Sequence, residues 1–85
     1  MSEDRTIYTV VDETGTKTTI TLDKWVADIL QEHFPDVHAW VQDTYDRVAT
    51  KKPHLGRRQK GDVVRVLSIN EVLKTPAGIA LMSEL

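Results

Sequence analysis

The sequence predicts a small α+β fold that is mostly helical, in a single domain of 85 residues. Three observations carry this prediction. β-Branched residues dominate two short segments near the N-terminus, Asp and Thr residues stand where helices would begin, and apolar residues then recur at helical spacing. A chain of this length has a small core, and it contains no cysteine that could reinforce that core with a disulfide. We therefore expect it to associate with a second chain.

Two β-rich segments predict a hairpin near the N-terminus. Residues 7–11 and 17–22 are rich in β-branched side chains, and the sequence Asp12-Glu13-Thr14-Gly15 between them is a turn signal. Side chains alternate along a strand, so the second segment has one more apolar face and one wholly polar face. These faces consist of Thr18, Ile20 and Leu22, and of Lys17, Thr19 and Thr21, respectively.

Two amphipathic helices are predicted next. Asp23 is a good N-cap, and apolar residues recur at helical spacing over residues 24–33. Pro35 ends this helix, because a residue before proline disfavours the α conformation, and Asp36 can cap a second helix over residues 37–49. The apolar stripe of the second helix comprises Val37, Trp40, Val41, Thr44, Tyr45 and Val48.

The C-terminal part of the chain predicts a connector and two further helical segments. Pro53 and Gly56 favour a connector, and Asp62 can cap a helix, although residues 63–67 are β-branched enough for a strand. We favour the helix. Thr75 followed by proline predicts the start of a short last helix over residues 77–85. The expected apolar side of the third helix consists of Val63, Val66, Leu67, Asn70 and Leu73.

Charge is distributed unevenly along the chain. Residues 1–46 contain three basic and ten acidic side chains, whereas residues 47–85 contain eight basic and three acidic ones. Six of the basic residues lie between Arg47 and Lys60 with no acidic residue among them. Such a cluster is typical either of a segment that contacts a polyanion or of a solvated linker.

The sequence contains no catalytic or metal-binding motif. His33, His38 and His54 do not share a helix face, and Gly15 and Lys17 lack the spacing of a phosphate-binding loop. We therefore expect a non-enzymatic protein with no metal and no cofactor. No apolar run reaches the roughly 18 residues of a membrane span, and the first residues do not resemble a signal peptide. We expect a cytoplasmic protein without a membrane partner.

The order of strand, helix and helix over residues 18–48 resembles the ribbon-helix-helix (Arc/MetJ-like) family of DNA-binding proteins. The alternating strand Thr19-Ile20-Thr21-Leu22 leads directly into the capped helix that begins after Asp23, and a second amphipathic helix follows a brief turn. The resemblance implies an intertwined homodimer whose two strands pair as a ribbon in the DNA major groove. A two-stranded ribbon matches the width of that groove.

The resemblance also implies roles for individual residues. The base-reading positions would be Lys17, Thr19 and Thr21. Phosphates would bind at the start of the second helix, at Val37 and His38. The basic connector is an addition to the family core, and we expect its charges to lie along flanking phosphates. These residues are Lys51, Lys52, Arg57, Arg58 and Lys60. The dimer core would consist of Ile20, Leu22, Val26, Ile29, Trp40 and Val41.

This interpretation divides the chain into four segments. They are an N-terminal strand and turn (1–15), a ribbon-helix-helix core (16–49), a basic connector (50–61) and a C-terminal helical extension (62–85). The predicted function is a sequence-specific transcriptional repressor that binds double-stranded DNA as a homodimer. In one version it represses its own operon, and in another it is an antitoxin whose residues 62–85 bind a partner protein.

An alternative function remains open at this point. Residues 5–11 are able to pair with residues 17–22 of the same chain, which would leave one edge of the ribbon strand for a partner chain and give a four-stranded dimer sheet. If the chain is instead monomeric, the hairpin would pack on the helices as one α+β domain. In that case the protein would be a non-enzymatic interaction adaptor, and its basic connector would serve only solubility.

Overall fold

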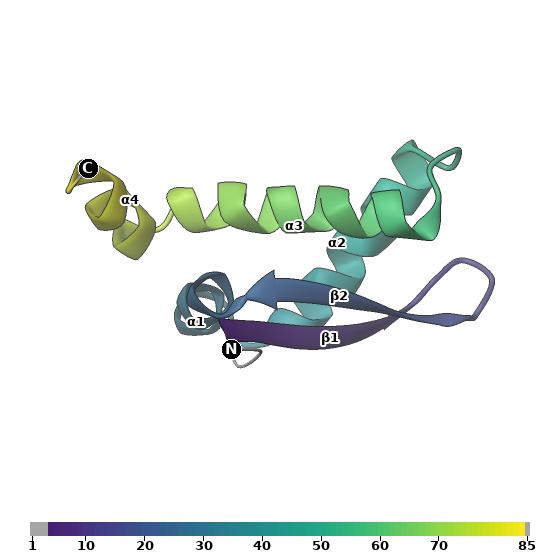
Figure 1. The fold of residues 1–85 in the computed structure, drawn as a ribbon, viewed down its shortest axis with the longest axis horizontal. Coiled ribbons are helices and arrows are strands. Elements are labelled where there is room, and N and C mark those ends of the chain that lie inside the picture. The colour runs from purple at the N-terminus through teal and green to yellow at the C-terminus, as the bar shows by residue number, and fades with distance from the viewer. Residues whose placement is uncertain (1–3, 85) are drawn as a thin grey trace.

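The computed structural model describes residues 4–84 and has six elements (Figure 1). Residues 1–3 and 85, which belong to the expected segments 1–15 and 62–85, lie outside the described residues. The protein is a small α+β fold in which an antiparallel hairpin precedes the helices. The elements are β1 (Arg5–Val11), β2 (Lys17–Asp23), α1 (Lys24–His33), α2 (Val37–Lys51), α3 (Arg57–Leu73) and α4 (Pro76–Ser83).

The two strands pair with each other within the chain. Their register runs from Arg5 opposite Asp23 to Val11 opposite Lys17. This pairing is the hairpin that the sequence predicts, and among the described residues it leaves the other edge of β2 without a strand partner. The faces predicted for the second strand are confirmed, because Ile20 and Leu22 are buried while Lys17 and Thr19 are exposed and Thr21 is half-buried.

The core lies between the inner face of the hairpin and the helices. α3 runs along β2, and α1 and α2 pack against the same hairpin (Figure 1). Burial of this apolar surface is the main favourable contribution to folding. The buried apolar side chains are Tyr8, Val10, Ile20 and Leu22 of the hairpin, Val26, Ala27 and Leu30 of α1, Val37, Val41, Tyr45 and Val48 of α2, and Val64 and Val72 of α3.

The first two helices agree closely with the sequence prediction. α1 has the predicted bounds, and α2 starts as predicted and continues two residues further, to Lys51. The Asp36 carboxylate caps α2 by accepting a hydrogen bond of 3.0 Å from the backbone N–H of Ala39. The apolar stripe predicted for α2 is buried, except that Trp40 is only partly covered.

The start of α3 differs from the prediction. α3 is a helix, as the sequence analysis favoured over a strand, but it begins at Arg57 and not at Asp62. The connector expected at residues 50–61 therefore ends five residues earlier. The Gln59 side chain stabilises this earlier start, because its Oε1 accepts a hydrogen bond of 3.0 Å from the backbone N–H of Gly56. Arg57, Arg58 and Lys60 consequently lie on a helix.

The side of α3 that faces the core was also predicted wrongly. Its buried residues are Lys60, Val64, Ser68 and Val72, whereas Val66 and Leu67 are exposed. Gly61 explains this choice, because a Cβ atom there would lie 3.2 Å from the Cδ1 atom of Ile20. The missing side chain lets α3 approach β2 closely on this side, although the other side is more apolar.

The last helix ends two residues before its predicted end. α4 occupies Pro76–Ser83, and Thr75 caps it by accepting a hydrogen bond of 3.0 Å from the backbone N–H of Gly78. None of the helices in residues 4–84 is both long enough and apolar enough to cross a membrane.

We predict that Leu22→Ala lowers the free energy of unfolding by about 2–5 kcal/mol, because the truncation removes a buried side chain and leaves a cavity. Thr19→Ala, on the exposed face of the same strand, should change this free energy by less than about 0.5 kcal/mol. Urea denaturation followed by circular dichroism measures both. Equal effects of the two substitutions would show that the strand faces are assigned wrongly.

Candidate functional site

An open groove of about 420 Å³ lies between β2 and the N-terminal half of α3. β2 contributes Thr18, Thr19 and Thr21 to its lining. Four arginines also line it, namely Arg5 from β1 and Arg57, Arg58 and Arg65 from α3. Asp62 is the acidic residue of the lining. The groove is therefore polar and predominantly basic, and we refer to it as the arginine groove.

The local sequence explains why these side chains meet. Among the described residues β2 pairs only with β1, so its other edge, on the side of α3, has no strand partner. Thr19 and Thr21 share the outer face of the hairpin with Arg5, because they lie at alternate positions in register with it. On α3, Arg58 and Arg65 lie seven residues apart and therefore on the same side of the helix.

The arginine groove keeps unneutralised positive charge. Arg57 Nε lies 3.5 Å from Asp12 Oδ2, and Arg65 Nη1 lies 3.8 Å from Asp62 Oδ1. Within residues 4–84, neither Arg5 nor Arg58 forms a salt bridge. Exposed pairs such as Arg65 with Asp62 are weak and can exchange partners. Arg58 and Arg65 can therefore contact an anionic ligand while the Arg57–Asp12 pair stays intact.

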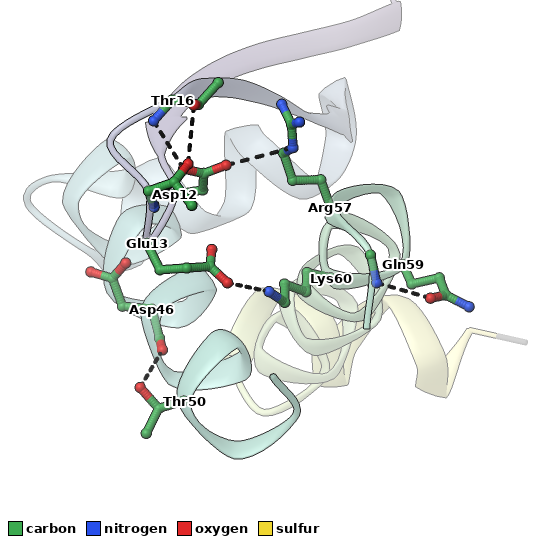
Figure 2. A network of polar contacts seen from close by, with 10 residues as sticks. Asp12, Glu13, Thr16, Asp46, Thr50, Arg57, Gln59 and Lys60 are labelled. Carbon is green, nitrogen blue, oxygen red and sulfur yellow. Dashed lines mark hydrogen bonds and ion pairs between the residues drawn. The ribbon is translucent and has the colours of Figure 1, made fainter. Parts of the chain in front are cut away.

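Two ion pairs hold the hairpin turn against the first turns of α3 (Figure 2). Lys60 Nζ donates a hydrogen bond to Glu13 Oε2, and the Lys60 side chain is only 4% exposed. Arg57 reaches the neighbouring Asp12, whose side chain is almost fully buried. We call these four residues the turn clamp. It positions α3 beside β2 and so defines one wall of the arginine groove.

The carboxylates of the turn clamp are held in their charged forms. The hydrogen bond of 2.7 Å from the Thr14 hydroxyl is the main cause that lowers the pKa of Asp12, assisted by the backbone N–H groups of Thr16 and Thr14. The hydrogen bond from Lys60 is the main cause that lowers the pKa of Glu13. Burial chiefly raises the pKa of Tyr45, whose hydroxyl has no hydrogen-bond partner within residues 4–84.

The structure brings together four of the residues that the sequence predicted to contact DNA. Thr19 and Thr21, expected to read bases, lie in the same groove as Arg57 and Arg58, expected to bind phosphate. The earlier start of α3 creates this proximity, because it places both arginines on a helix that packs beside β2.

Other predicted contact residues lie elsewhere. Lys17 is exposed at the start of β2, and Lys51 and Lys52 are exposed at the end of α2, all outside the lining of the groove. Val37 is buried in the core. The His38 ring stacks on Tyr8 with its centroid 6.3 Å away, and its Nε2 atom is hydrogen-bonded to the carbonyl oxygen of Thr9.

Lys60 requires a correction. The sequence predicts that Lys60 binds phosphate, but its side chain is buried and forms an ion pair with Glu13. Lys60 therefore stabilises the fold and does not face a ligand. The six residues predicted for a dimer core already pack within one chain. Ile20, Leu22, Val26 and Val41 are buried there, and Ile29 and Trp40 are partly buried against them.

Sequence reasoning missed Arg5, Arg65 and Thr18 as residues of the groove, as well as the turn clamp. If the predicted helix had been extended back to Gly56, helical spacing would have placed four residues of the groove on one side of it. They are Arg58, Gly61, Asp62 and Arg65. The clamp joins residues that are 45 and more positions apart, and no sequence periodicity links them.

Within residues 4–84, no group of three histidine, aspartate or glutamate side chains is placed to hold a metal ion. No protein-family model, characterised protein or solved structure matches the chain. The resemblance to the ribbon-helix-helix family therefore stays a prediction.

We predict that acid weakens the turn clamp. A carboxylate whose pKa is lowered by folding stabilises the protein above its unfolded pKa, and this contribution is lost as the pH falls through the folded pKa. The stability difference between wild type and Asp12→Asn should therefore be largest near neutral pH. It should shrink progressively below about pH 4.

Urea denaturation at a series of pH values measures this difference, and Asp43→Asn serves as the control because Asp43 is exposed on α2. An Asp12→Asn difference that is independent of pH, or equal to that of the control, would contradict a structural role for the charged Asp12.

Proposed function

We propose that the protein is a non-enzymatic, sequence-specific DNA-binding repressor that contacts double-stranded DNA through the arginine groove. One observation carries the proposal: arginines from two elements surround a row of threonines on an open strand edge. Arginine binds phosphate oxygens in a bidentate manner, and threonine offers a hydroxyl and a methyl group to base edges. The groove therefore combines groups that position a duplex with groups able to distinguish its sequence.

The start of α3 adds to the attraction for phosphate. The first backbone N–H groups of a helix lack intrahelical partners, and the helix dipole places partial positive charge there. Arg57 and Arg58 follow immediately after the N-cap Gly56. A phosphate beside this first turn would interact with the guanidinium groups and with the helix terminus together.

The hairpin supports a variant of the ribbon mechanism. In the ribbon-helix-helix family the two strands of the ribbon come from two chains, whereas here β1 and β2 form a two-stranded ribbon within one chain. Its outer face carries Lys17, Thr19 and Thr21. We propose that this face enters the major groove while Arg57 and Arg58 contact the flanking backbone. Lys51 and Lys52 would extend the phosphate contacts.

The alternative function is the protein-interaction adaptor. The pairing of both strands within one chain favours it, because that interpretation assumed a hairpin-plus-helices domain. In this case an acidic, extended segment of another protein would occupy the arginine groove, and the affinity for DNA would be weak and without sequence preference.

We predict that Arg58→Ala weakens DNA binding by about tenfold, because one phosphate contact is lost. The slope of the logarithm of the binding constant against the logarithm of the salt concentration should become shallower by about one. Thr19→Ala with Thr21→Ala should instead reduce the preference for the specific duplex over a random one. Fluorescence anisotropy with labelled DNA from upstream of its own gene, at two salt concentrations, measures both effects.

Lys74→Ala is the matched control, because Lys74 is an exposed cation at the opposite end of α3. If Arg58→Ala and Lys74→Ala bind equally, the arginine groove is not the DNA site. If wild type shows no binding at low salt, the adaptor function is favoured.

A further inference from the structure

The two edges of the hairpin differ in how they are covered. On the outer edge of β1, the Gln42 side chain pairs with the backbone of Val11 as a neighbouring strand would. Its Oε1 accepts a hydrogen bond of 2.9 Å from the Val11 N–H, and its Nε2 donates one of 3.0 Å to the Val11 carbonyl oxygen. On the same edge, His38 Nε2 is hydrogen-bonded to the carbonyl oxygen of Thr9. Side chains of α2 therefore cover the β1 edge.

The edge of β2 is left uncovered. Successive residues of a strand direct their N–H and C=O groups alternately toward the paired strand and away from it. Asp12 donates its N–H to the Thr16 carbonyl oxygen at 2.9 Å, so the even-numbered residues of the hairpin are those that bond across it. The backbone groups of Thr19 and Thr21 therefore point outward, and within residues 4–84 no hydrogen bond from outside the hairpin reaches them.

β2 has the features of a strand that another strand can join. It runs for seven residues in unbroken register with β1, and it contains neither a proline nor a bulge. Proteins commonly protect an exposed edge with such features, or with a covering element as α2 does for β1. An extended peptide that adds to a bare edge gains main-chain hydrogen bonds along its length. Of the two edges of the hairpin, that of β2 is the one open to such a peptide.

The outward backbone groups of β2 require both a donor and an acceptor from a ligand. The phosphate oxygens of DNA accept hydrogen bonds from protein, so they pair with the N–H groups of Thr19 and Thr21 but leave the carbonyl oxygens of these residues without donors. A peptide in extended conformation presents an N–H and a C=O together at every second residue and therefore pairs with both. The backbone edge itself is thus better matched by an extended peptide than by DNA.

The charges beside this edge indicate that the peptide is acidic. α3 runs along β2 (Figure 1), and its Arg58 and Arg65 line the arginine groove. Among the described residues Arg58 forms no salt bridge, and Arg65 has only an exposed partner on its own helix. Alternate side chains of an added strand point to one face, so carboxylates on the α3 side would pair with these arginines. A second copy fits less well, because its β2 edge would bring its own groove arginines against the first set.

We propose that an acidic, extended segment of a partner protein adds to β2 as a third strand, and that it thereby excludes DNA from the arginine groove. The backbone of β2 binds the segment, and the arginines of α3 favour its negative charge. The exclusion of DNA rests on the proposed function, because both ligands would use Arg58 and the same strand edge. The addition of the strand does not rest on it, and it is measured without DNA.

Fluorescence anisotropy of a labelled synthetic peptide tests the strand addition. The peptide alternates threonine and glutamate and is as long as β2. One derivative is N-methylated at every threonine and another at every glutamate, so only one of them has its methyl groups on the side that faces β2. The strand addition predicts that this derivative binds at least about tenfold more weakly than the other, although their charges are equal. Equal binding of the two derivatives, or no binding of the unmethylated peptide at low salt, would overturn the proposal.

A proline substitution places the contact on the β2 edge. Thr19→Pro removes an outward N–H and puts a ring on that edge without breaking a hydrogen bond between the strands. It should weaken binding of the unmethylated peptide by at least about tenfold. Thr9→Pro is the matched control, because Thr9 lies directly opposite Thr19 and its N–H faces the β1 edge. This control should bind as wild type does, and equal weakening in two variants with native circular dichroism would overturn the proposal.

Competition tests the exclusion of DNA. The unmethylated peptide should release a labelled duplex from wild type, whereas the weakly binding derivative should need at least about tenfold more peptide for the same release. A duplex that stays bound while the peptide binds would overturn the exclusion. If wild type binds no duplex at all, the proposed function and the exclusion fail together, and the anisotropy of the labelled peptide still decides the strand addition.

Discussion

The attachment of α3 to the hairpin is the contact on which the rest of the structure depends. An 85-residue chain has a thin core, and a single hairpin is at most marginally stable without a layer packed on it. Val64 and Val72 supply apolar contact from α3, and Gly61 permits its close approach to Ile20. The Lys60–Glu13 pair fixes the N-terminal half of the helix beside the turn.

The arginine groove is a consequence of this attachment. Its two walls are β2 and the first half of α3, and neither wall alone gathers threonines and arginines. Charge is divided between two tasks along α3. Lys60 is buried and stabilises the fold, whereas Arg58 and Arg65 line the groove. The same helix continues to Leu73 and carries α4 at its far end.

Local signals predicted the hairpin and the first two helices well. Alternation in residues 17–22, the cap Asp36 and the proline at position 35 act over a few residues, and the structure has the faces and starts that they indicate. α1 also starts after Asp23 as predicted, but the Asp23 side chain makes no capping hydrogen bond. α3 was harder to predict for two reasons. Its N-terminus depends on the Gln59 side chain instead of a standard cap, and its buried side is selected by the close approach at Gly61, which only the tertiary structure reveals.

The candidate site was predicted in part for the same reasons. Thr19 and Thr21 followed from strand alternation, and Arg57 and Arg58 followed from the basic cluster. Charge clustering alone could not separate Lys60 from its neighbours, because its burial depends on the distant Glu13. Arg5 enters the groove only through the register of the two strands, which requires that they pair within one chain.

A nuclear magnetic resonance titration of the ¹⁵N-labelled protein with a DNA duplex tests the central claim most directly, because it reports on every backbone amide. The account predicts chemical-shift changes at residues 18–21 and 57–65, where β2 and α3 line the arginine groove. Residues 79–82 of α4 should be unaffected by the DNA. Changes confined to the start of α2 or to α4, with none along β2 and the first half of α3, would contradict it.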